Sequence, residues 1–111
     1  ATALSTQATL IMARITKELQ QASSFSVINA TNMTFKTTGG ETVSYSWESP
    51  ILTRIGTTFS NQVTNFSLTY YQSNFTTATS LINVRAVTIS MTLNNGNESV
   101  PLINTVFLVG R

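Results

Sequence analysis

The sequence lacks three residue types on which many enzyme and metal sites depend. Its 111 residues include no cysteine, no histidine and no aspartate, and the four acidic residues are all glutamates. Without His or Cys, neither a Ser-His-Asp triad nor a Cys-His pair is available, and zinc and copper lose their usual ligands. The composition therefore predicts a protein that is not an enzyme, with no metal or cofactor and no disulfide bond to stabilise it.

Charged residues are scarce as well. They make up 9% of the chain, with a net charge of +2, against about a quarter of an average soluble domain. The six basic residues are scattered, whereas a nucleic-acid-binding protein needs a concentrated basic face. The uncharged run 55–84 is too rich in Ser, Thr, Asn and Gln to cross a bilayer, and the apolar tail 101–109 is too short, since a span takes roughly 20 apolar residues.

The first 22 residues have the pattern of an amphipathic helix. Apolar residues recur every three or four positions and fall on one stripe. The stripe consists of Leu4, Ala8, Ile11, Met12, Ile15, Leu19 and Ala22. No capping box precedes the stripe. The segment is therefore either the second part of a longer helix or a helix with an ordinary frayed start, capped by Thr2 or Ser5.

From residue 25 onward the hydrophobic period changes to two, which is typical of β-strands. Gly-containing turns are expected at 37–40 and 94–97, and the polar stretch 72–80 is expected to be a loop. Tyr45 and Trp47 share one face of their strand and are expected in the core. The segment 102–109 has apolar residues on both faces, which predicts a central or covered strand. The expected strands are 25–27, 33–35, 43–47, 51–55, 66–70, 87–93 and 102–109.

These patterns predict one α+β domain over residues 1–111. It consists of an N-terminal amphipathic helix (1–22) packed on an antiparallel sheet of six or seven strands (25–111). A helix with one apolar stripe and a sheet with one apolar face bury each other.

Several segments, in this order, resemble the soluble part of type IV pilin-like minor pseudopilins. The nearest groups are the J-type pseudopilins of type II secretion and the PilW-like minor pilins. The resemblance is carried by ARITKELQQAS (13–23), ETVSYSW (41–47), ILTRIG (51–56), VTNFSLTYYQ (63–72), VRAVTISMTL (84–93) and INTVFLVGR (103–111).

The resemblance implies a pilin-like fold and a structural role. Such a protein would be an assembly subunit in the tip or priming complex of a type II secretion or type IV pilus fibre. A membrane half-helix, with the prepilin processing and methylation site, would precede Ala1 and anchor it in the bacterial inner membrane. This domain would then lie in the periplasm or on the cell-surface fibre. The implied partners are other minor subunits, with no cofactor, nucleic acid or small-molecule substrate.

One position on the helix suggests where partners bind. Leu10 lies roughly opposite the apolar stripe, with Ala3 and Gln7 near it and Arg14 one turn further on. An isolated exposed Leu is common and often has no role. In a subunit that packs helix against helix, Leu10 would instead be a subunit contact, so these four residues form the candidate interface.

A different class of function also fits the composition. An extracellular β-rich module that binds carbohydrate or protein, with the helix as a stem, would show an exposed aromatic patch on its sheet or loops. Five Asn-x-Ser/Thr sequons, at Asn29, Asn32, Asn65, Asn74 and Asn97, follow from the abundance of Asn, Ser and Thr and are interpreted as composition.

Overall fold

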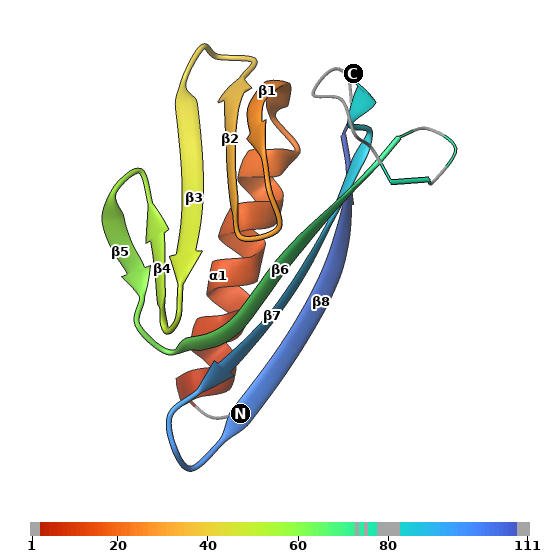
Figure 1. Ribbon diagram of the computed structural model, residues 1–111. Coiled ribbons are helices and arrows are strands. Elements are labelled where there is room, and N and C mark those ends of the chain that lie inside the picture. Colours follow the sequence, from red (N-terminus) through yellow and green to blue (C-terminus); the bar gives the residue numbers. More distant parts are fainter. Residues whose placement is uncertain (1–2, 73, 75, 78–82, 109–111) are drawn as a thin grey trace.

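The computed structural model describes residues 3–72, 74, 76–77 and 83–108, where one α-helix is followed by eight β-strands (Figure 1). The helix is α1 (Ala3–Leu19). The first five strands are β1 (Ala22–Ile28), β2 (Asn32–Thr37), β3 (Thr42–Glu48), β4 (Ile51–Arg54) and β5 (Thr57–Ser60). The last three are β6 (Val63–Tyr71), β7 (Ala86–Asn94) and β8 (Ser99–Phe107).

The strands form two antiparallel sheets, not the single sheet of six or seven strands that was expected. One sheet has the order β1-β2-β3-β4-β5 and the other has the order β6-β7-β8. They touch where the Val63 N–H donates to the Pro50 carbonyl at 3.0 Å and the Leu68 N–H donates to the Ala30 carbonyl at 2.8 Å. The α+β class is confirmed, while the period-two pattern could not show how the strands divide between sheets.

Helix α1 lies behind both sheets in the view of Figure 1 and packs its apolar stripe against them. All seven residues of the predicted stripe are buried, and Ala8, Ile15 and Leu19 have no exposed surface. The helix ends at Leu19, not at residue 22, and Ala22 begins β1. The Gln21 carbonyl accepts a hydrogen bond from the Thr38 N–H at 2.9 Å, so the chain has already turned toward the sheet there.

Strand β5 was missed because its sequence has no apolar alternation. It reads Thr-Thr-Phe-Ser, and only Phe59 is a large apolar residue. The strand pairs with β4 through a two-residue turn, Ile55-Gly56, in which both residues have positive φ angles of 52° and 77°. This is the backbone of a primed hairpin turn, in which Asn-Gly is the usual pair. The short strand thus follows from the turn and not from a hydrophobic pattern.

The position predicted for the last strand was wrong. Strand β8 is an edge strand, paired only with β7 in the described part of the chain, and it is neither central nor covered. Its inward face packs toward the core, but Ile103 on its outward face is 72% exposed. The end of the predicted strand, Val109, lies outside the described residues, as do residues 73, 75 and 78–80 of the expected 72–80 loop.

The core aromatic residues lie where the strand pattern placed them. Tyr45 is fully buried, and Trp47 is half-buried against the core with its indole N–H donating to the Val63 carbonyl at 2.9 Å. Tyr70 is buried and its hydroxyl donates to the Asn29 carbonyl at 2.8 Å. Tyr71, its neighbour, points to the partly exposed face, as alternation requires.

We predict that Ile15→Ala lowers the free energy of unfolding by about 3 kcal/mol, because it removes a fully buried side chain and leaves a cavity. The control is Leu10→Ala on the opposite side of the same helix, where exposure limits the effect to about 0.5 kcal/mol. Urea unfolding followed by circular dichroism measures both. Equal losses would contradict the packing of α1 described above.

We also predict that Ile55→Asn stabilises the protein by about 1 kcal/mol. A β-branched residue with positive φ is costly, and Asn tolerates this conformation. The matched control is Ile51→Asn in β4, which is similarly exposed but has no positive φ. The same urea unfolding measurement applies, and a midpoint lowered by Ile55→Asn would contradict the turn geometry.

Candidate interface on the helix

The outer face of α1 is not covered by either sheet. Its stripe occupies one side of the helix, so the residues on the opposite side remain in contact with solvent. Leu10 is 65% exposed, and Ala13 beside it is exposed as well. Leu10 and Ala13 lie near the middle of the helix, and the charged residues Arg14 and Lys17 follow them on the same face.

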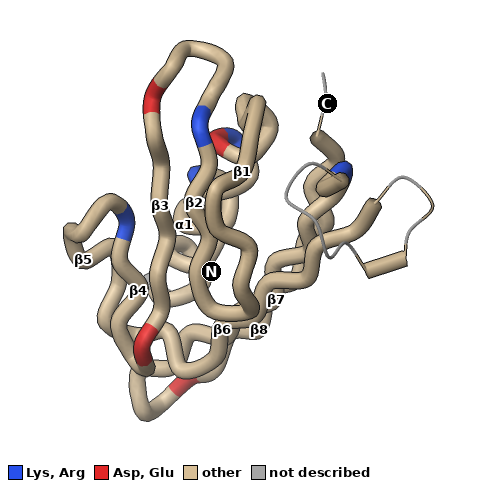
Figure 2. Tube along the Cα trace, turned by 45° about the horizontal axis from the view of Figure 1, so that its top comes forward, with Lys and Arg blue, Asp and Glu red and all other residues tan. Residues whose placement is uncertain are grey.

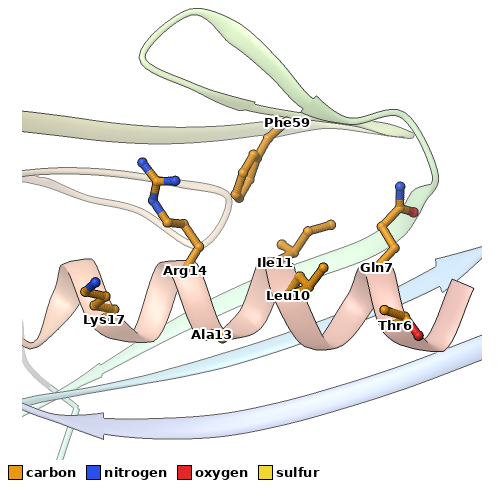
Figure 3. Close-up of a pocket in the computed structure, with 8 residues that line it drawn as sticks. All are labelled: Thr6, Gln7, Leu10, Ile11, Ala13, Arg14, Lys17 and Phe59. Atoms are coloured by element: carbon orange, nitrogen blue, oxygen red, sulfur yellow. The ribbon is translucent and has the colours of Figure 1, made fainter. Parts of the chain in front are cut away.

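An open groove of about 820 Å³ runs between α1 and the end of the five-stranded sheet. Figure 3 shows Phe59 of β5 reaching over the helix near Ile11 and Arg14, opposite Leu10. The Phe59 ring, which forms one wall of the groove, also packs on the buried Tyr45 with ring centroids 6.0 Å apart. The core therefore fixes the position of this wall. The groove is lined by Thr6, Gln7, Leu10, Ile11, Ala13, Arg14, Lys17 and Phe59.

A second groove, of about 400 Å³, lies on the other side of the helix, against β8. Leu102 and Asn104 form its far wall, and the Asn104 amide donates to the Thr16 hydroxyl at 3.0 Å. Ala13 and Lys17 line both grooves. The outer face of α1 is therefore a ridge with a groove along each side, and a small residue, Ala13, stands on its crest.

An ionic cluster ties the C-terminal end of α1 to the five-stranded sheet. The Glu18 carboxylate is 13% exposed. Arg54 Nε donates to its two oxygens at 2.9 and 3.1 Å, and Arg54 Nη2 donates to Oε2 as well. The Tyr45 hydroxyl donates to Oε1, and Arg14 Nε lies 3.4 Å from Oε2. The cluster thereby orients Arg14 at the rim of the larger groove.

The cluster changes the protonation behaviour of its members. Burial disfavours the charged carboxylate, but hydrogen bonds from Arg54 and Tyr45 and the nearby guanidinium charges outweigh it, so the pKa of Glu18 is lowered. Burial, together with the adjacent carboxylate, raises the pKa of the Tyr45 hydroxyl. The hydrogen bond to Glu18 raises the pKa of Arg54. Glu18 is therefore held ionised and Tyr45 neutral, which is a structural arrangement.

The four residues of the candidate interface can now be placed. Gln7, Leu10 and Arg14 line the larger groove together. Ala3 begins α1, but its side chain lies outside the described part of the chain. Sequence reasoning missed Phe59, because it stands alone in a polar segment, and Ala13, because a small residue carries no pattern. Their role in binding a partner remains a prediction.

The described residues hold no cluster of three or more potential metal ligands among His, Cys, Asp and Glu. Within the same part of the chain, no helix has the length and apolar character needed to cross a bilayer.

Comparisons of the chain with protein families, with curated protein sequences and with solved structures find no match.

We predict that the ionic cluster makes the free energy of unfolding decrease as the pH falls into the acid range. Because the pKa of Glu18 is lower in the folded state, its contribution is complete above the ordinary value of 4.5 and is lost as the pH falls through the folded-state value. Glu18→Gln should lower the free energy of unfolding by about 2 kcal/mol at neutral pH. It should also reduce the loss of stability at low pH, which we call the acid limb of the curve of stability against pH.

The control for Glu18→Gln is Glu98→Gln, which changes an exposed glutamate in the turn between β7 and β8. It should alter stability by less than about 0.5 kcal/mol and keep the acid limb. Urea unfolding at a series of pH values measures both variants. An acid limb that survives Glu18→Gln unchanged would contradict the assignment.

Proposed function

We propose that this chain is the globular part of a structural assembly subunit, of the minor pseudopilin or minor pilin kind, and that it packs against partner subunits through the outer face of α1. The observation that carries the proposal is the uncovered ridge of α1, with Leu10 65% exposed beside an apolar groove. An apolar surface of this kind, rimmed by polar residues, is typical of a protein–protein contact.

The two grooves suit packing on both sides of the helix. Helices pack with their axes about 8–10 Å apart, and small residues favour the shorter distances. Ala13 on the crest leaves room for such an approach, and Leu10 supplies a side chain that fits a partner's groove. Head-to-tail contacts through two different surfaces build open filaments where the rotation between subunits does not close. The two grooves offer two such surfaces, which is compatible with a place inside a fibre.

The arrangement of the chain supports the finer proposal of a pilin-like fold. The segments that resemble minor pseudopilins fall on α1 and then on β3, β4, β6, β7 and β8, in chain order. The helix lies on one side of antiparallel sheets, with its other side open. In this proposal the protein is anchored in the inner membrane by an apolar helix continuous with α1. The domain then lies in the periplasm or on the surface fibre and needs no cofactor or substrate.

The alternative, a β-rich module that binds carbohydrate or protein, has less support. Among the described aromatic residues, only Phe107 is largely exposed, at 58%, while the others are buried or half-buried. An aromatic platform for a sugar needs flat rings that solvent can reach. Leu10 on the helix face, at 65%, is more exposed than any described aromatic side chain.

The coding sequence upstream of Ala1 tests the class directly. The proposal expects a short basic leader followed by roughly 20 apolar residues, whose three-to-four spacing continues into the stripe of α1. A stop codon, or an initiator Met directly before Ala1, would remove the anchored fibre subunit from consideration. A conventional cleaved signal peptide would do the same, and the binding module would become the leading proposal.

We predict that Leu10→Arg leaves folding intact and weakens assembly by at least about tenfold in partner recovery, because burying an unpaired charge is costly. The test is co-purification of subunits from membranes of the source cell with tagged full-length protein, identifying partners by mass spectrometry. Ser67→Arg, which places the same charge on the exposed face of β6, is the control. Equal recovery with wild type and Leu10→Arg would contradict the proposed interface.

A further inference from the structure

The two sheets have four edge strands in the described structure, and three of them are protected. Strand β1 is interrupted by two register shifts against β2. Strand β5 is only four residues long and is paired irregularly. The free edge of β6 is covered, because its Leu68 and Val63 N–H groups donate to the Ala30 and Pro50 carbonyls. Bulges, short strands and covering loops are the usual means by which proteins prevent edge-to-edge pairing.

Strand β8 has one of the usual protections, an edge proline (Pro101), and lacks the others. It is nine residues long and pairs with β7 without a register shift. None of its residues is charged, although charged side chains are one of the usual guards of an edge. Figure 2 shows that β6, β7 and β8 carry no Lys, Arg, Asp or Glu along their length. Ile103, at the midpoint of β8, is 72% exposed.

The register shows which backbone groups face the open edge. The Leu108 N–H donates to the Arg85 carbonyl at 2.9 Å, on the β7 side. Since pairing alternates along an antiparallel ladder, the even-numbered residues of β8 bond to β7 and the odd-numbered ones point away. Pro101, which has no N–H, falls on the outward side, as edge prolines do. The N–H and C=O groups of Ile103 and Thr105 therefore point to the edge.

From this edge we infer that β8 pairs antiparallel with β8 of a second copy of the chain, joining two three-stranded sheets into one of six strands. A twofold axis at Ile103 places the two Ile103 residues opposite each other and Pro101 opposite Thr105. The Ile103 pair can exchange two backbone hydrogen bonds, but each Pro101–Thr105 pair makes only one, because proline has no N–H to donate. A copy of the same strand is the partner we infer, because two uncharged strands do not repel each other and a twofold axis brings their exposed Ile103 side chains together. In this dimer the two exposed Ile103 side chains pack against each other, so that each loses apolar surface to water.

The proposed dimer is weak and reversible. A single pair of strands buries an area at the lower end of specific interfaces, so the expected dissociation constant is on the order of 100 µM. Helix α1 does not block the approach, because it contacts the inward face of β8 through Leu102 and Asn104. The inference is independent of the proposed function, which uses the outer face of α1.

Sedimentation velocity of the 111-residue domain, from about 10 µM to about 1 mM, tests the pairing. Wild type should shift from monomer toward dimer over this range. Ile103→Lys, which places two like charges opposite each other, should raise the dissociation constant at least about tenfold. Ser67→Lys is the matched control, because Ser67, Ser90 and Ile103 form one row across the sheet but Ser67 is away from the edge. It should dimerise as wild type does.

The absence of native cysteine allows a test of the register. Under mild oxidation Ile103→Cys should form a disulfide-linked dimer, because directly opposed Cα atoms lie about 5.5 Å apart. Thr105→Cys should not, because the two Cys residues are then four residues apart along the strands, roughly 13 Å. Crosslinking of Thr105→Cys in preference to Ile103→Cys would overturn the register.

Two further outcomes would overturn the pairing itself. One is wild type that remains monomeric throughout the concentration range. The other is a dimer that persists in Ile103→Lys. A dimer that Leu10→Arg abolishes while Ile103→Lys leaves it intact would assign self-association to the helix face instead.

Discussion

Burial of one helix stripe against two separate sheets is the contact on which the rest of the structure depends. The two sheets also contact each other, through Phe25 on Tyr70 and Trp47 on Phe66, and the stripe of α1 completes the core that they share. The chain has no disulfide bond and few charges, so apolar burial must supply most of its stability. Each large side chain buried at this junction contributes roughly 1.5–3 kcal/mol. Ile15 and Leu19, which have no exposed surface, lie within the core that spans helix and sheets.

This arrangement also creates the candidate interface. A helix that packs one side against its own sheets leaves the opposite side exposed to solvent. The ends of the two sheets lie along the two flanks of this exposed side. Phe59 forms one wall and Leu102 with Asn104 forms the other. The Glu18–Arg54 cluster fixes the end of the helix against the five-stranded sheet, so the ridge is held in a defined position. The candidate interface is thus a consequence of the packing that stabilises the fold.

The low charge of the chain shapes the three-stranded sheet. Its outer face carries hydroxyl groups where many exposed sheets carry Lys and Glu, and cross-strand pairs such as Thr88 and Thr105, whose hydroxyls lie 2.8 Å apart, satisfy them. These hydroxyl groups hydrogen-bond with water and with each other, so they hydrate the face without adding charge. They do not guard an edge, however, because a hydroxyl carries no charge that would repel another strand. The same composition that keeps this face hydrated leaves β8 open to a second copy.

The helix stripe, the change of period at residue 25 and most strands could be predicted from the sequence, because each depends on the spacing of neighbouring residues. Leu10 could also be placed opposite the stripe, since helix geometry is local. Three features depended on tertiary structure: the division into two sheets, the edge position of β8 and the wall formed by Phe59. Each results from contacts between residues far apart in the chain. An apolar residue such as Ile103 has the same local pattern whether its strand lies at the centre or at the edge. Only the packed structure decides which face water reaches.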